Sequence, residues 1–123
     1  MQRYVLVVDD NPDVCMMIVD ALELFDIEGV TAVSGEEALR RVEDSVPAAI
    51  ILDLMMPNMN GFGVIHRLRQ KAASRDIPVI ILSAVADSPG GIGRLPGVVG
   101  VICKGDFSLD RFRTVLGAAG IAA

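Results

Sequence analysis

The chain has 123 residues, a length that suits one compact domain and leaves no room for a second. Hydrophobic residues make up 52% of it, which is ample for a buried core, so a disordered chain is not expected. The net charge of −5 at pH 7 would repel the phosphates of nucleic acid, so we expect this domain to bind none. The same charge favours a site for a divalent cation or a partner with a basic face.

The two cysteines, Cys15 and Cys103, lie far apart and outside any CxxC pattern. We therefore predict two buried, reduced thiols. The sequence opens without a charged and then apolar leader, and no apolar run approaches the roughly 20 residues that span a bilayer. We expect a soluble, cytoplasmic protein with no membrane partner.

Five short apolar runs are predicted to be strands. In chain order they are Tyr4–Val8, Val30–Val33, Ala48–Leu52, Pro78–Leu82 and Val98–Cys103. The first is a β-branched run with polar residues only at its ends, the pattern of a strand that is covered on both faces.

Segments of helical period alternate with these strands. Asn11 and Pro12 supply a cap and a first-turn proline for the first helix. Ser34 and Glu37 have the spacing of a capping box at the start of the second. A third helix is predicted from Gly61 to about residue 71, and a last one over residues 108–116. The apolar side of the first helix is predicted to carry Val14, Ile18, Ala21, Leu22 and Phe25. That of the third helix is predicted to carry Phe62, Ile65 and Leu68.

This alternation predicts an α/β fold of the flavodoxin-like (βα)5 type. Its five-stranded parallel sheet is doubly wound, with strand order 2-1-3-4-5. One segment departs from the rhythm, because four glycines and two prolines fall between Ser83 and Val98. We therefore predict a short or irregular fourth helix over residues 86–97.

Polar residues follow or end the apolar strands at one edge of the predicted sheet: Asp9, Asp10, Asp53, Ser83 and Lys104. Functional groups of open parallel sheets collect at the carboxyl ends of the strands, so three carboxylates are expected to converge there. Like charges repel strongly in a partly buried site. A hard divalent cation with oxygen ligands would offset them, and Lys104 would add a second positive charge.

This group of residues favours phosphoryl transfer. A carboxylate is a competent nucleophile towards phosphorus, and Asp53 is assigned this role because it stands alone at its strand end. Asp9 and Asp10 would hold Mg²⁺, which can bridge a carboxylate and the incoming phosphoryl oxygens. Lys104 and the Ser83 hydroxyl would take up the remaining oxygens.

The same residues resemble the response-regulator receiver domain of two-component systems. The resemblance covers essentially the whole chain, residues 1–123, and its motifs are Val7-Val8-Asp9-Asp10, Ile51-Leu52-Asp53 through Gly61, Ser83-Ala84 and Lys104. It implies a phosphorelay switch rather than a turnover enzyme. A histidine kinase, a phosphotransfer protein or a small phosphodonor would phosphorylate Asp53, and the aspartyl phosphate would hydrolyse slowly.

The resemblance also implies a ligand set. Mg²⁺ would be bound by Asp10, Asp53 and the backbone carbonyl of Met55, with Asp9 acting largely through water. Ser83 and Lys104 would contact the phosphoryl group.

Two positions depart from the family pattern. Gly105 follows the lysine where the family usually has proline, and Val101 stands where the family has its switch aromatic residue. An alternative function is therefore a degenerate receiver that acts as a phosphorylation-independent interaction module. In the main hypothesis, phosphorylation pulls on Ser83 and shifts residues 84–97 between ordered and disordered forms; the signal would then pass to an unknown downstream protein or effector domain.

Two other α/β functions fit poorly. A phosphatase of the haloacid dehalogenase type needs a second aspartate where this chain has Met55. A flavodoxin needs a first loop that cradles phosphate, and the acidic loop over residues 9–13 would repel one.

Several residues are predicted to have ordinary structural roles. His66 is expected on a helix surface, and Asp13 as an exposed first-turn acid. Three methionines are expected to pack the loop after Asp53: Met55, Met56 and Met59. Three basic residues are expected to form a solvated helix end: Arg67, Arg69 and Lys71.

Overall fold

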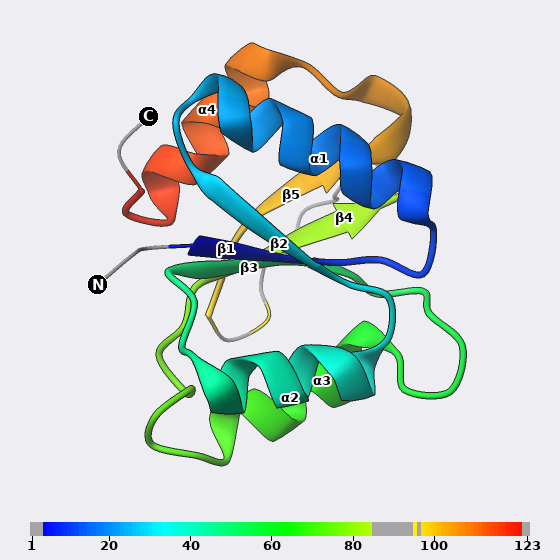
Figure 1. Cartoon of the computed structure of the whole chain (residues 1–123), viewed down its shortest axis with the longest axis vertical. Helices are drawn as coiled ribbons and strands as arrows, with labels where there is room; N and C mark the ends of the chain where they lie inside the picture. The colour runs from blue at the N-terminus through cyan, green and yellow to red at the C-terminus, as the bar shows by residue number, and fades with distance from the viewer. Residues whose placement is uncertain (1–3, 85–94, 96, 122–123) are drawn as a thin grey trace.

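Five parallel strands form one sheet between two layers of helices (Figure 1). The computed structural model describes residues 4–84, 95 and 97–121. The strands are β1 (Tyr4–Val8), β2 (Glu28–Ala32), β3 (Ala49–Asp53), β4 (Val79–Ser83) and β5 (Val98–Cys103). Their order is β2-β1-β3-β4-β5 and every neighbouring pair is parallel, which confirms the predicted topology.

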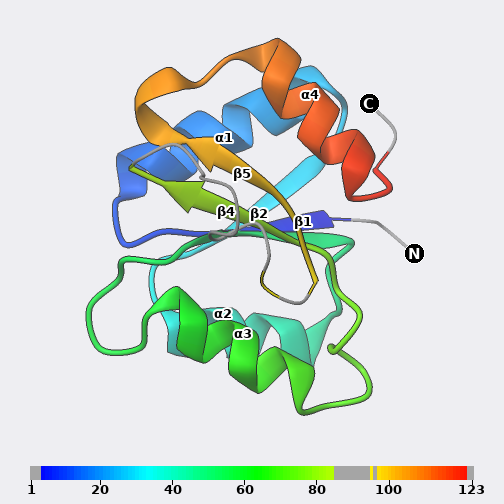
Figure 2. The same ribbon diagram turned by 180° about the vertical axis from the view of Figure 1, so that it is seen from behind.

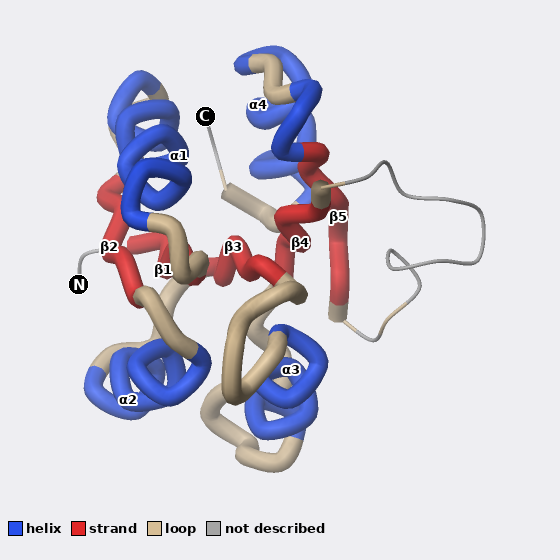
Figure 3. Tube along the Cα trace, turned by 90° about the vertical axis from the view of Figure 1, so that its right-hand side faces the viewer, coloured by secondary structure: helices blue, strands red, loops and turns tan. Residues whose placement is uncertain are grey.

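Two described helices cover each face of the sheet. Viewed along the sheet, α1 (Pro12–Leu24) and α4 (Leu109–Ala118) lie on one side, and α2 (Gly35–Asp44) and α3 (Gly61–Arg69) lie on the other (Figure 3). Side chains cap their first turns as predicted. Asn11 Oδ1 accepts a hydrogen bond from the amide of Asp13 at 2.9 Å, and Ser34 Oγ accepts one from Glu37 at 3.1 Å.

A separate hydrophobic core fills the space on each side of the sheet. The central strands β1, β3 and β4 are buried at every position, so their side chains alternate between the two cores. Large residues with less than 2% exposure include Leu6, Ile50, Leu52, Leu68 and Ile81 on the α2–α3 side, and Ile18, Leu22, Ile51, Ile80 and Phe112 on the α1–α4 side.

The predicted boundaries of two elements were wrong. β2 begins at Glu28 rather than Val30, because Glu28 and Gly29 pair with the first residues of β1. β2 is an edge strand, and its backbone can pair with β1 even where its side chains are polar or small. The apolar pattern therefore underestimated the length of β2. α3 ends at Arg69, two residues before the predicted end.

The side chains of α3 also differ from the prediction. Phe62 is 48% exposed, whereas Val64 is fully buried beside Ile65 and Leu68. The buried face of this helix is thus rotated towards Val64, and its only aromatic ring is left at the surface.

Arg69 does not belong to a solvated helix end. Its Nη1 donates hydrogen bonds to the carbonyl oxygens of Arg75 at 2.6 Å and Ile77 at 3.1 Å. Arg67 and Lys71 are exposed, as predicted.

The predicted methionine packing was correct for two residues of three. Met56 is buried and Met59 packs against the core on the α2–α3 side, but the Met55 side chain is 81% exposed.

The cysteine prediction was correct except for the burial of Cys103. Both thiols are free, and Cys15 is buried, but Cys103 is only partly buried.

None of the helices within the described ranges is long and apolar enough to cross a bilayer. The irregular fourth helix was predicted over 86–97, and most of that range lies outside the residues that the structure describes.

Candidate functional site

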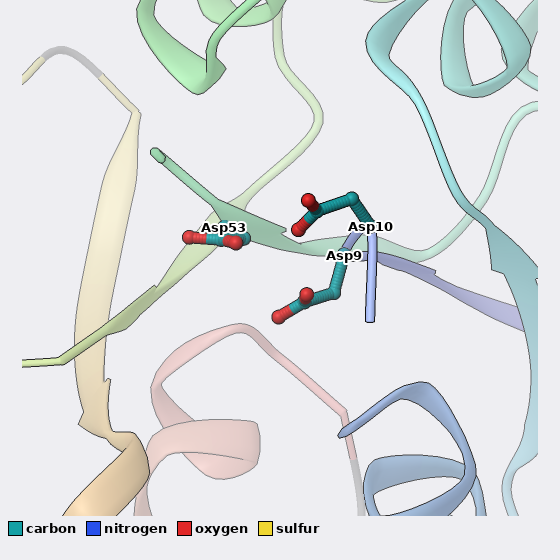
Figure 4. Close-up of side chains that lie close together, drawn as sticks. All are labelled: Asp9, Asp10 and Asp53. Atoms are coloured by element: carbon teal, nitrogen blue, oxygen red, sulfur yellow. The ribbon is translucent and has the colours of Figure 1, made fainter. Parts of the chain in front are cut away.

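Three carboxylates meet at the carboxyl edge of the sheet, as predicted. Asp9 and Asp10 follow β1, and Asp53 is the last residue of the neighbouring strand β3 (Figure 4). Each offers one ligand oxygen, and these atoms lie within 4.8 Å of one another. Asp9 and Asp53 are 0% and 3% exposed, whereas Asp10 is exposed to solvent. Two buried acids and one accessible acid therefore share one site.

Asp9 is held by its neighbours on several sides. Its Oδ1 accepts a hydrogen bond from the Asn11 amide at 2.9 Å, and its own amide donates to the Ala32 carbonyl at 3.1 Å. The buried thiol of Cys15 donates to the Asp9 carbonyl at 3.3 Å. Burial raises the pKa of this thiol to about 11, with the Asp9 charge adding to the effect, so it remains a protonated donor at neutral pH. Sequence analysis assigned Asn11 and Cys15 no part in the site, and only the proximity of both to Asp9 in the chain hinted at one.

Asp53 is fixed by the backbone of the loop that follows it. Its Oδ1 accepts a hydrogen bond from the Met55 amide at 3.0 Å. Burial raises the pKa of its carboxyl group; the Met55 amide opposes the shift, the Asp9 charge adds to it, and Lys104 opposes it. The ionised form of Asp53 is thus less stable than that of an exposed aspartate, and a cation nearby would stabilise it.

Lys104 supplies one such cation. It follows β5 directly, and its Nζ lies 2.8 Å from Asp9 Oδ2 and 3.2 Å from Asp53 Oδ2. Burial lowers the pKa of this lysine, but its hydrogen bonds and charge interactions with Asp9 and Asp53 outweigh that effect, and the net shift is upward. Lys104 is therefore charged at neutral pH.

The charges of the site do not balance. Three carboxylates face one lysine, which leaves two uncompensated negative charges in a largely buried cluster. All the side-chain donors are oxygens, the ligands that Mg²⁺ prefers, and the exposed carboxylate of Asp10 leaves an approach from solvent. The residues present fit a Mg²⁺ ion.

Ser83 lies at the same edge. It is the last residue of β4 and is 9% exposed; Leu82, which precedes it, pairs with Asp53 in the sheet. Two predicted surface residues lie away from the carboxylates, His66 exposed on α3 and Asp13 exposed in the first turn of α1.

The two departures from the family pattern have different surroundings. Gly105 lies in a single 3₁₀ turn over Lys104–Asp106, and a Cβ atom added to it would meet no other atom within 4 Å. Val101 is buried in β5, in the core on the α2–α3 side. Neither residue separates Lys104 from the two buried carboxylates.

Comparisons with known proteins agree with this geometry. The family model described as "Response regulator receiver domain" matches residues 5–111. The chain therefore belongs to the response regulator receiver family. As a receiver domain it is a component of two-component signalling and not a turnover enzyme.

A transcriptional regulator by name is among the curated relatives of this chain. The transcriptional regulatory protein PrrA of Mycobacterium tuberculosis is 46% identical over 80 residues, which are 65% of this chain and 34% of PrrA. The chain thus spans about a third of the length of the curated relatives it matches.

Solved structures show the same fold. The chemotaxis protein CheY4 of Vibrio cholerae superposes with a TM-score of 0.84 at 27% identity, covering 97% of this chain and 99% of that chain. The receiver domain of the sensor histidine kinase PA1611 of Pseudomonas aeruginosa has a TM-score of 0.81 at 22% identity, over 98% and 99% of the two chains, and that protein has a magnesium ion in its active-site cleft.

Proposed function

We propose that this receiver domain, taken as residues 1–123, accepts a phosphoryl group on Asp53 in a Mg²⁺-dependent reaction. The donor is the phosphohistidine of a histidine kinase or phosphotransfer protein, or a small phosphodonor. One observation carries the proposal: the Lys104 ammonium group lies between the buried Asp53 and Asp9 carboxylates, with Asp10 within ligand reach. Nucleophile, positive charge and metal ligands thus converge on one point.

The proposed reaction forms one bond to phosphorus and breaks another. An oxygen of the Asp53 carboxylate attacks phosphorus, and the P–N bond to the donor histidine breaks. The imidazole nitrogen keeps the electron pair and takes a proton from solvent. The signal would end by slow hydrolysis of the aspartyl phosphate. Water attacks phosphorus, the aspartyl P–O bond breaks, and inorganic phosphate leaves the restored carboxylate.

The proposed Mg²⁺ ligands are the carboxylates of Asp10 and Asp53 and the backbone carbonyl of Met55, with Asp9 acting largely through water. Bound Mg²⁺ would offset the charge of the carboxylates and of the incoming phosphoryl oxygens. The exposed side chain of Met55 leaves the backbone of this residue as its contribution to the site. The magnesium ion in the active-site cleft of the PA1611 receiver domain supports this assignment.

Lys104 and Ser83 are the proposed partners of the phosphoryl oxygens. Lys104 is charged and already contacts Asp53, so phosphorylation would give its ammonium group new acceptors. The Ser83 hydroxyl would donate a hydrogen bond from the end of β4. The signal would then pass to a downstream protein or effector domain; the relative PrrA is named a transcriptional regulatory protein. The proposal places the domain in the cytoplasm, where ATP supplies the kinase with its phosphoryl group.

Intact mass spectrometry after incubation with acetyl phosphate and Mg²⁺ tests the proposal. We expect one added phosphoryl group on the wild-type chain, which EDTA prevents. Asp53→Asn should remove the adduct, because an amide is a poor nucleophile. Asp13→Asn is the matched control, since Asp13 is an exposed acid on α1 outside the cluster, and it should be labelled like the wild type.

The opposite result has a defined meaning. No adduct under conditions that label a competent receiver would overturn the proposal and assign the chain to phosphorylation-independent interaction modules. An adduct that survives Asp53→Asn would place the acceptor elsewhere.

A further inference from the structure

A groove of about 550 Å³ lies beside α3, and none of its lining residues belongs to the carboxylate cluster. Phe62, Ile65 and His66 of α3 form one wall. The other wall consists of Arg75 and Asp76, from the loop before β4, and Leu95, which precedes β5. Figure 2 shows α3 and the start of β5 on this side of the molecule. The volume lies within the range of roughly 300–1,000 Å³ that is usual for ligand sites.

The apolar residues of the groove are partly exposed. Phe62 is 48% exposed, although burying an aromatic ring is strongly favourable, whereas Ile65 is 7% exposed. Leu95 is partly buried and packs against the core on the α2–α3 side. An exposed aromatic ring beside a side chain that packs against the core offers a partner side chain an apolar contact.

The rim of the groove is more basic than the rest of the molecule. Its charged residues are Arg69, Arg75 and Asp76, which sum to +1 with His66 neutral, whereas the whole chain has a net charge of −5. Arg69 is engaged by the carbonyls of Arg75 and Ile77. Arg75 is exposed, and within the described part of the chain its side chain has no ion pair. Its guanidinium group can therefore receive a carboxylate from outside.

We propose that this groove binds an acidic peptide segment of a partner protein. An aromatic or aliphatic side chain of the peptide lies against Phe62 and Leu95, and a carboxylate of the peptide pairs with Arg75. The inference goes beyond the proposed function, since none of these residues belongs to the carboxylate cluster. Nucleic acid and anionic membranes are disfavoured as occupants by the chain's net negative charge, whereas a short peptide needs only the local positive charge.

A peptide titration tests the proposal. The probe is acetyl-Glu-Phe-Glu-Leu-amide, added to the ¹⁵N-labelled full chain without Mg²⁺ or phosphodonor, so that the outcome is independent of phosphorylation. We expect amide shift changes at residues 62–69, 75–76 and 95, with weak affinity. The charge-inverted probe acetyl-Lys-Phe-Lys-Leu-amide should bind at least tenfold more weakly.

Matched variants locate the site. Phe62→Ala and Arg75→Glu should each weaken binding of the acidic probe at least fivefold. Leu109→Ala and Arg113→Glu are the controls, because these residues are similarly exposed on α4, on the opposite side of the sheet, and should leave binding unchanged.

Three outcomes would overturn the proposal. The first is equal affinity for the two probes, and the second is binding that the Phe62 and Arg75 variants do not change. The third is a set of concentration-dependent shifts at the same residues without any peptide, which would make a second copy of this chain the occupant. Since Phe62 and Arg75 are at the surface, their variants should keep the wild-type thermal midpoint.

Discussion

Lys104 and Arg69 are two partly buried cations at opposite edges of the same sheet, and they differ in their partners. Lys104 follows β5 at the carboxyl edge and contacts two carboxylates. Arg69 lies at the amino edge, where it donates to two backbone carbonyls just before β4. The pKa of Lys104 is raised because its carboxylates outweigh burial, and that of Arg69 is lowered because burial outweighs the charge of Asp76.

The difference separates a cation whose partners can be exchanged from one that is fixed to the backbone. The partners of Lys104 are carboxylates that a divalent cation can also engage, so its contacts can be exchanged when such a cation binds. Two partners of Arg69 are backbone carbonyls of the loop before β4, so these hydrogen bonds hold that loop in place.

The largest expected effect is the loss of stability when Lys104 is replaced. Lys104→Met leaves two buried carboxylates without their cation, and we expect a loss of about 3 kcal/mol in the free energy of unfolding without divalent cations. Saturating Mg²⁺ should restore much of it. Urea denaturation with EDTA and with Mg²⁺ measures both values.

The control for Lys104 is another lysine at the same distance from its acid. Lys71 Nζ lies 2.8 Å from Glu43 Oε1, but both side chains are exposed to solvent that screens the pair, so Lys71→Met should change stability little. Equal losses in the two variants would show that burial of the carboxylates has no role.

The next effect concerns Arg69. Arg69→Met removes the donors of the Arg75 and Ile77 carbonyls, and we expect a loss of about 2 kcal/mol. Mg²⁺ should not restore it, in contrast to the Lys104 variant. Arg67→Met, at an exposed position on the same helix, should change stability little. Recovery of Arg69→Met by Mg²⁺ would contradict the distinction between the two cations.

A smaller effect is expected where the backbone approaches Arg69. Gly97 has φ +77°, and a Cβ atom there would lie 1.9 Å from Arg69 Nη2, so Gly97→Ala should cost about 1.5 kcal/mol. Its effect should shrink when Arg69 is also replaced. Gly105→Ala should be neutral or slightly stabilising, because Gly105 has open space around it. Thermal unfolding of the single and double variants checks these values.

The smallest effect is a gain in stability, and it depends on pH. The pKa of Asp53 is raised above 3.8 in the folded state, so its ionisation lowers stability as pH rises from about 3.8 through the folded pKa. Asp53→Asn should therefore be more stable than the wild type at pH 7 without divalent cations, and the gain should vanish below pH 3.8. A gain that is independent of pH would show that charge is not its cause.

The strands and the carboxylate site could be predicted because both depend on local pattern. Apolar runs of five residues located the central strands, and the polar residues at or just beyond their ends then had to share one edge of a parallel sheet. Side-chain caps at Asn11 and Ser34 marked two helix starts correctly. These features depend on residues that are close together in the chain.

The errors concern contacts between distant segments. Arg69 was predicted to be solvated. Nothing in the sequence indicates that the backbone carbonyls of Arg75 and Ile77 would lie within hydrogen-bond distance of it. Phe62 was predicted to lie on the buried side of α3 with Ile65 and Leu68, whereas the packing of α3 turned Val64 inwards. The contacts of Asn11 and Cys15 with Asp9 likewise depend on how the loop after β1 folds back.

By itself the sequence determined the order of the elements, the parallel sheet and the set of residues at its carboxyl edge. Periodicity and strand-end chemistry are properties of neighbouring residues, which explains why these features are readable without coordinates. Tertiary structure decided that Arg69 binds backbone carbonyls rather than solvent, and which apolar side chain of α3 remains at the surface. Those outcomes depend on packing between segments far apart in the chain, where a rotation of one helix face exchanges a buried residue for an exposed one.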